Sequence, residues 1–104
     1  MNIAKMMKQA QQMQSKMQQM QEDLAERSVE ATVGGGKVTV VATCAGDVES
    51  IKIDPAVVDP EDVEMLEDLV LSGVKQAIEQ GKAVAAEEMK SATSGMGLPP
   101  GLGL

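Results

Sequence analysis

The chain has 104 residues, which is enough for one small domain and too few for two. It contains no Phe, Tyr or Trp, so any core must be built from Val, Ile, Leu, Ala and nine Met, and base stacking on single strands is excluded as a main binding mode. The formal net charge of -7 favours solubility and, taken alone, argues against a nucleic-acid or anionic-membrane partner.

The charge is unevenly distributed along the chain. Residues 1–21 carry Lys5, Lys8 and Lys16 and no acid, so this segment has a charge of +3. The remaining six basic and sixteen acidic residues give -10 from Glu22 onward. The chain is therefore electrically polar from one end to the other.

The first predicted element is a long helix over residues 3–26. Its apolar residues are spaced alternately by three and four, which is an a/d heptad pattern, and no Gly or Pro occurs before residue 34. At about 1.5 Å per residue the helix is roughly 36 Å long, so it should project from the domain or lie across a partner. We call its apolar row the Met seam, which consists of Ile3, Met6, Ala10, Met13, Met17, Met20 and Leu24.

The Met seam has a competing interpretation as a metal site. Thioethers bind Cu(I), and Met13, Met17 and Met20 have suitable spacing. A metal site would leave the Ile, Ala and Leu members of the row unexplained, whereas an adaptable apolar surface explains all seven. A disordered glutamine tract would not keep so regular a period. Whether the seam packs within one subunit, against its own sheet, or across a dimer stays open.

From Val29 the apolar period changes to two, which predicts strands. Residues 29–33 and 38–43 alternate, and Gly34-Gly35-Gly36 between them predicts a hairpin turn. Cys44-Ala45-Gly46-Asp47 predicts a second turn, followed by a third strand over 48–53 in which Val48 is out of phase. Three antiparallel strands with short connections form a meander.

A second helix follows the sheet. Asp54-Pro55 ends the third strand, and Asp59-Pro60-Glu61-Asp62 predicts a helix start with Asp59 as the cap and Pro60 at the first helical position. The helix should continue through Gly81 to about Ala92, with Gly73 and Gly81 as weak points or close contacts. Its apolar face is Val63, Leu66, Val70, Val74, Ala77 and Ile78.

The predicted fold class is therefore α+β: a long N-terminal helix, a three-stranded antiparallel sheet and a long C-terminal helix. Residues 1–93 form a single domain, and residues 94–104, rich in Gly and Pro, are predicted to be a flexible tail.

The residues offer little chemistry for catalysis. There is no His or Tyr, and Cys44 has no His to activate it. The acids of 59–64 fit the ordinary stabilisation of a helix start, and the glycine run lacks a phosphate-loop pattern. We expect no enzyme, cofactor, metal or small-molecule substrate. With a single cysteine, no spanning apolar run and no signal peptide, we expect a cytoplasmic protein with no membrane partner.

Binding is the remaining class of function. On the heptad, Lys5 and Lys8 lie at c and f, away from the Met seam, and Lys16 lies at g beside it. Two such helices in a dimer would present six lysines on outer surfaces, which suits contacts with phosphates. Lysines on an exposed helix also serve simply to keep it soluble, so spacing alone does not decide.

Four segments in order resemble the YbaB/EbfC family of bacterial nucleoid-associated proteins. They are MKQAQQMQSKMQQMQEDLAE, GGGKVTVVATCAGDVESIKIDP, EDVEMLEDLV and the closing SGMGLPPGLG. No single segment is a catalytic signature, but together in a chain of this length they are specific.

The resemblance implies a cytoplasmic, nucleoid homodimer whose helices extend from paired sheets like tweezer arms. It implies binding to double-stranded DNA with little or modest sequence preference, and an influence on nucleoid organisation and gene expression. Positions that match the family's DNA-contacting helices are Lys5, Lys8 and Lys16 on the first helix and Lys82 and Lys90 on the last.

Two departures qualify this expectation. The strand region VVATCAGDVES is less basic than in many relatives, and the overall negative charge opposes DNA outside the basic segment, so affinity should be modest. The alternative is a protein-interaction adaptor that uses its Met-rich helix or acidic second helix without a direct DNA role.

Overall fold

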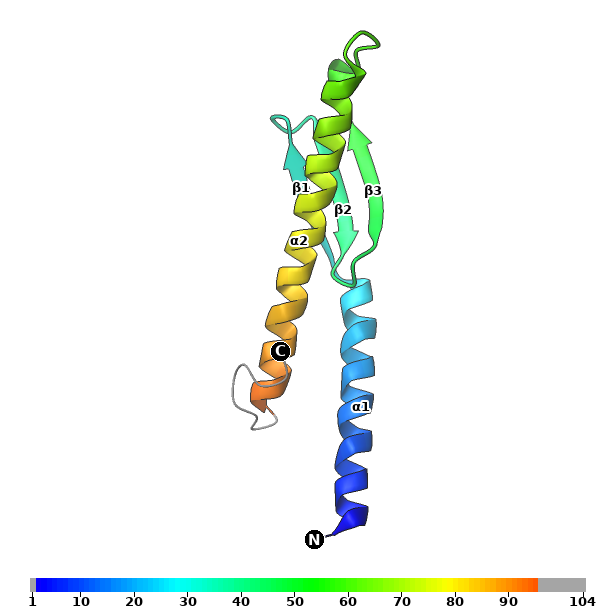
Figure 1. The fold of residues 1–104 in the computed structure, drawn as a ribbon, viewed down its shortest axis with the longest axis vertical. Coiled ribbons are helices and arrows are strands. Elements are labelled where there is room, and N and C mark those ends of the chain that lie inside the picture. The colour runs from blue at the N-terminus through cyan, green and yellow to red at the C-terminus, as the bar shows by residue number, and fades with distance from the viewer. Residues whose placement is uncertain (1, 96–104) are drawn as a thin grey trace.

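The computed structural model describes residues 2–95 and contains the predicted order of elements (Figure 1). A long helix, three strands and a second long helix form an elongated molecule with extents of 70 × 22 × 17 Å. The α+β fold class is thus confirmed. The elements are α1 (Ile3–Glu26), β1 (Ser28–Val33), β2 (Val38–Thr43), β3 (Val48–Ile53), the single turn η1 (Pro55–Val57) and α2 (Val63–Gly95).

Both ends of α1 lie where the heptad pattern placed them. The side chain of Asn2 caps the helix, because its Oδ1 accepts a hydrogen bond of 3.2 Å from the backbone N–H of Lys5. At the other end Arg27 is extended, and its N–H donates to the carbonyls of Asp23 and Leu24. The backbone then enters β1 directly, so the direction of α1 is coupled to that of the sheet.

The three strands form an antiparallel meander in the order β1-β2-β3. The turn between β1 and β2 requires its glycines, since Gly34, Gly35 and Gly36 have φ values of 64°, 67° and 86°, a region that L side chains rarely adopt. In the second pairing Val41 lies opposite Ser50 and Ala42 opposite Val48, which leaves Glu49 as the extra residue of a bulge. This bulge explains why Val48 is out of phase in the sequence and yet shares the face of Ile51.

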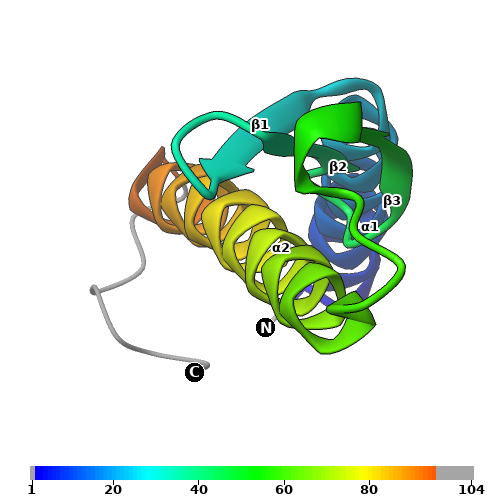
Figure 2. The ribbon, with the colours of Figure 1, turned by 90° about the horizontal axis from the view of Figure 1, so that it is seen from above.

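The core lies between one face of the sheet and α2 (Figure 2). Its side chains are small, as a chain without aromatic residues demands, and α2 therefore approaches closely. A Cβ on Gly73 would lie 2.8 Å from Cγ2 of Val40, and one on Gly81 would lie 2.9 Å from the carbonyl oxygen of Thr43. Both glycines mark close contacts. The fully buried residues of the core are Ala31, Val38, Val40, Ala42 and Ala77.

The predicted start of α2 was three residues early. Asp59 does not cap the helix; it folds a separate turn, in which its Oδ1 accepts from the N–H of Glu61 and its carbonyl from that of Asp62. Pro60 lies in this turn. The cap is Asp62, whose Oδ1 accepts a hydrogen bond of 3.3 Å from the N–H of Met65.

The helix also extends beyond its predicted end at about residue 92. It continues to Gly95, the last described residue, so Ser94 and Gly95, which the tail prediction included, are helical. The rest of the predicted tail, residues 96–104, lies outside the described residues. The division into a domain over 1–93 and a tail over 94–104 stays a prediction.

Candidate nucleic-acid interface

The N-terminal two-thirds of α1 projects beyond the end of the sheet (Figure 1). Residues 2–16 are all exposed, including members of the Met seam: Ile3 is 71% exposed, Met6 53% and Met13 41%. Only the last turns are attached, where Leu24 is buried and the helix end lies against β2. The seam thus closes within the subunit at its C-terminal end and is uncovered over the rest.

The projecting segment carries three of the five predicted site residues. Lys5, Lys8 and Lys16 are exposed on α1, and no acid occurs on this helix before Glu22. Their positive charge is therefore not neutralised by a carboxylate within the same stretch of helix. This segment is a surface of uniform positive charge on an otherwise acidic protein.

The other two predicted site residues lie in a different electrostatic setting. Lys82 and Lys90 are exposed on α2, and each follows a glutamate by three residues, Glu79 and Glu87 respectively. Side chains three apart on a helix are neighbours, so these carboxylates reduce the local positive potential. The two lysine sets occupy separate helices, and Lys16 alone among the five lines the cleft between them.

This cleft of about 620 Å³ lies between the C-terminal halves of α1 and α2. At one side Nη1 of Arg27 forms an ion pair of 2.8 Å with Oε1 of Glu88, which links the helices. The lining carries both signs of charge, because Asp23 and Glu88 face the cleft with Lys16 and Arg27. Sequence reasoning missed the ion pair, since its partners are 61 residues apart and no local pattern joins them. The cleft fits neither an anion nor a cation well.

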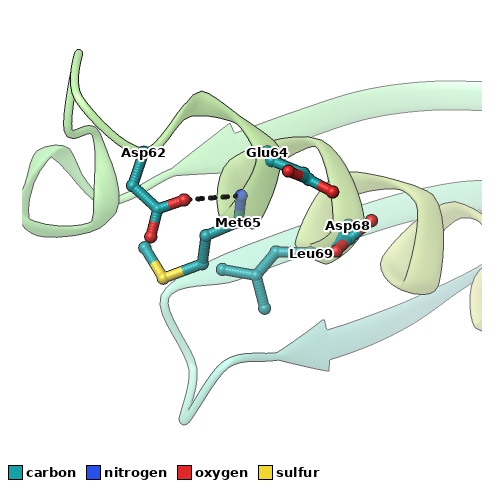
Figure 3. A pocket seen from close by; sticks show the side chains of 5 residues that line it. All are labelled: Asp62, Glu64, Met65, Asp68 and Leu69. Atoms are coloured by element: carbon teal, nitrogen blue, oxygen red, sulfur yellow. Dashed lines mark hydrogen bonds between the residues drawn. The ribbon is translucent and has the colours of Figure 1, made fainter.

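A second hollow at the start of α2 is acidic (Figure 3). Asp62, Glu64 and Asp68 line it together with Met65 and Leu69, and Asp62 caps the helix. Within residues 2–95 no group of three His, Cys, Asp or Glu is arranged to hold a metal ion. The acids stabilise the positive end of the helix, as their position in the sequence indicates, and they make this end of the molecule negatively charged.

One carboxyl group has a perturbed pKa, and it lies away from the basic helix. The pKa of Asp54 is lowered because the backbone N–H of Ala56 donates to it and the ammonium of Lys37 is 3.4 Å from its Oδ2. Both interactions fix the chain as it leaves β3. They are structural, and the thiol of Cys44 is likewise buried in the packing beneath α2.

No helix in the described part of the chain is long and apolar enough to cross a membrane. Three exposed surfaces are candidates for binding: the basic segment of α1, the exposed Met seam and the apolar side of β3, where Val48 and Ile51 are each 41% exposed.

Comparisons with known proteins identify the family. Residues 1–96 match the model of the YbaB/EbfC DNA-binding family. A nucleoid-associated protein of Akkermansia muciniphila is 50% identical over 103 residues, covering 99% of both chains. Another from Thermoanaerobacter sp. is 52% identical over 98 residues, covering 94% of this chain and 88% of the relative.

A solved structure supports the fold. The crystal structure of an uncharacterized protein from Helicobacter pylori matches with a TM-score of 0.69 at 22% identity, covering 92% of this chain and 97% of that one. At this identity the likeness concerns the fold alone. The family match and the two relatives extend over nearly the whole chain, and the protein therefore belongs to the YbaB/EbfC DNA-binding family.

Proposed function

We propose that this protein binds double-stranded DNA in the bacterial nucleoid as a homodimer and influences nucleoid organisation and gene expression. The observation that carries the proposal is the projecting N-terminal two-thirds of α1, which is free of acids and exposed up to residue 16, in a chain of a DNA-binding family. The relatives named as nucleoid-associated proteins support the location. Nothing in the described residues favours catalysis, and we assign no enzymatic role.

The lysines of α1 make the main DNA contacts. Lys5 and Lys16 are eleven residues apart, or about 17 Å along the helix, which is enough to reach several phosphates. Phosphate contacts carry no sequence information, so the preference among DNA sequences is low. Lys82 and Lys90 contribute less, because each has a neighbouring glutamate.

The homodimer forms through the part of the sheet's core-facing side that α2 leaves uncovered, which lies at β3. We call this part the uncovered side of the sheet. Val48, Ile51 and Ile53 share the core-facing side of the sheet and are still 38–41% exposed, because α2 lies mainly over β1 and β2. Leu69 packs at the hairpin that joins β1 and β2, and Leu71, about 200° further round the helix, is 54% exposed. A second copy that covers this apolar surface removes it from water.

The test is electrophoretic shift of duplex DNA across a salt series. With about six phosphates neutralised by a dimer, log K should fall with log salt at a slope near -5, at about 0.9 per contact. Replacing Lys5, Lys8 and Lys16 by Gln should weaken binding at low salt by at least about tenfold and flatten the slope.

A matched control removes the same charge elsewhere. Lys37, Lys52 and Lys75 are also exposed, and they lie in the β1–β2 turn, on β3 and on α2 respectively. Their replacement by Gln changes the net charge equally and should leave the slope nearly unchanged. Equal effects of the two triple variants, or a slope near zero for the unaltered protein, would contradict the assigned contacts.

A further inference from the structure

The outer face of α1, opposite the Met seam, combines one lysine with polar side chains of the kind that can hydrogen-bond to base edges. At about 100° per residue, Lys8, Gln11, Gln12 and Ser15 fall within one third of the helix circumference, centred opposite the seam. All four are exposed. This set, which we call the outer face, contains no acid and no bulky apolar residue.

Two glutamines of the outer face are available for new hydrogen bonds. Gln19 donates to Asp23 and Gln76 to Ser72, whereas neither Gln11 nor Gln12 has a side-chain hydrogen bond to any described residue. A glutamine amide offers one acceptor and two donors. In the major groove it pairs with adenine, donating to N7 and accepting from the N6 amine.

The shape of the projecting segment fits the major groove. An α-helix with its side chains is about 10–12 Å across, and the major groove is about 12 Å wide. Insertion requires a helix uncovered around its whole circumference, and α1 meets this condition up to residue 16. Lys8 and Ser15 are about 10 Å apart along the axis, a length that spans about three base pairs.

We infer that the outer face of α1 enters the DNA major groove and that Gln11 and Gln12 read adenine there, which adds a short sequence preference to binding through phosphates. The inference rests on the proposed function and deepens it. Because a site of about three base pairs recurs many times in any gene, such a preference is compatible with binding throughout a genome. With the outer face in the groove, the Met seam points away from the DNA.

The test compares two duplexes of identical sequence, one with adenine and one with 7-deazaadenine, which lacks only the N7 acceptor. The unaltered protein should bind the 7-deaza duplex roughly two- to tenfold more weakly, since one of the two hydrogen bonds of the pair is lost. The variant Gln11→Ala/Gln12→Ala should bind both duplexes equally, with an unchanged salt slope because no charge is altered.

The control is Gln21→Ala, which removes an exposed glutamine on the flank of the Met seam and should keep the discrimination of the unaltered protein. Discrimination that arose from an effect of 7-deazaadenine on duplex shape would persist in Gln11→Ala/Gln12→Ala, so the double variant separates that cause from base reading. Since alanine favours helices, circular dichroism should show α1 intact in both variants.

The possible failures are distinguishable. Equal binding of the two duplexes by the unaltered protein, or discrimination that survives Gln11→Ala/Gln12→Ala, overturns the inference and leaves the proposed function standing. Absence of binding to either duplex removes the proposed function itself, and the inference with it.

Discussion

At residue 81, glycine is required because the backbone of another element passes directly beneath it. A Cβ there would lie 2.9 Å from the carbonyl oxygen of Thr43 and 3.3 Å from Cα of Cys44. Backbone atoms at the end of a strand cannot move aside as the tip of a side chain can. The same close approach lets a core of small residues remain well packed.

We therefore predict that Gly81→Ala destabilises the fold by about 1–3 kcal/mol, the usual cost of overpacking, even though alanine favours a helix by about 1 kcal/mol over glycine. Chemical denaturation followed by circular dichroism measures this. The neighbouring exposed Gln80→Ala is the control and should change stability by no more than about 0.5 kcal/mol. A neutral or stabilising Gly81→Ala would contradict the close packing.

At the scale of elements, the attachment of α1 depends on its last turns. Leu24 is 3% exposed, while the rest of the Met seam becomes progressively more exposed toward the N-terminus. Arg27 strengthens the junction, because its carbonyl accepts a hydrogen bond of 2.9 Å from the N–H of Cys44 and its side chain pairs with Glu88. The ion pair is half-exposed and contributes little by itself.

Leu24→Ala should accordingly cost about 2–5 kcal/mol, the range for removing a buried leucine side chain. Met13→Ala, in the same seam and helix, should have little effect on a subunit in which Met13 is 41% exposed. Thermal unfolding of both variants at low protein concentration gives the comparison. A large loss of stability from Met13→Ala would mean that the projecting part of the seam is covered by another chain.

The elements were predictable because each has a strong local signal. The heptad pattern predicts α1, the glycine run predicts the hairpin, and the alternation of apolar residues predicts the strands. The alternation is broken at Val48, and the bulge explains why. The predicted start of α2 was wrong because Asp59 and Asp62 are both residues that cap helices well. Only the structure shows that Asp59 accepts a hydrogen bond within its own turn and that Asp62 caps the helix. Local sequence does not encode which of two adjacent caps the helix uses.

Long-range features were beyond the sequence. The pairing of Arg27 with Glu88 depends on how α1 and α2 lie relative to the sheet. The sequence suggested Gly81 as a weak point or a close contact, but it did not show that the contact is with the end of β2. The candidate site was more accessible to sequence reasoning, because charge and heptad position alone place Lys5 and Lys8 away from the Met seam. What the structure adds is that the segment carrying them projects uncovered.

At the scale of the whole molecule, the charge pattern and the shape act together. The basic segment of α1 stands away from an otherwise acidic chain, so in the proposed binding mode DNA should approach this segment while repulsion keeps the rest of the molecule at a distance. One subunit offers few phosphate contacts, and binding at physiological salt depends on the number of lysines held in one assembly. Oligomeric state and DNA affinity should therefore change together.

The final prediction tests this coupling with Val48→Ser/Ile51→Ser, which makes the uncovered side of the sheet polar without changing charge. Sedimentation at micromolar concentration should show a dimer for the unaltered protein and a monomer for the variant, because the apolar surface that favours association is lost. The salt slope of DNA binding should become less steep, from near -5 to about -3, because a monomer has three lysines on α1 and a dimer has six. Val41→Ser, on the opposite face of the same sheet, should remain dimeric and keep the steeper slope. If the Val48→Ser/Ile51→Ser variant stays dimeric, the dimer contact would instead be assigned to the Met seam. If the variant is a monomer but keeps the full salt slope, each subunit must bind DNA with contacts beyond the lysines of α1.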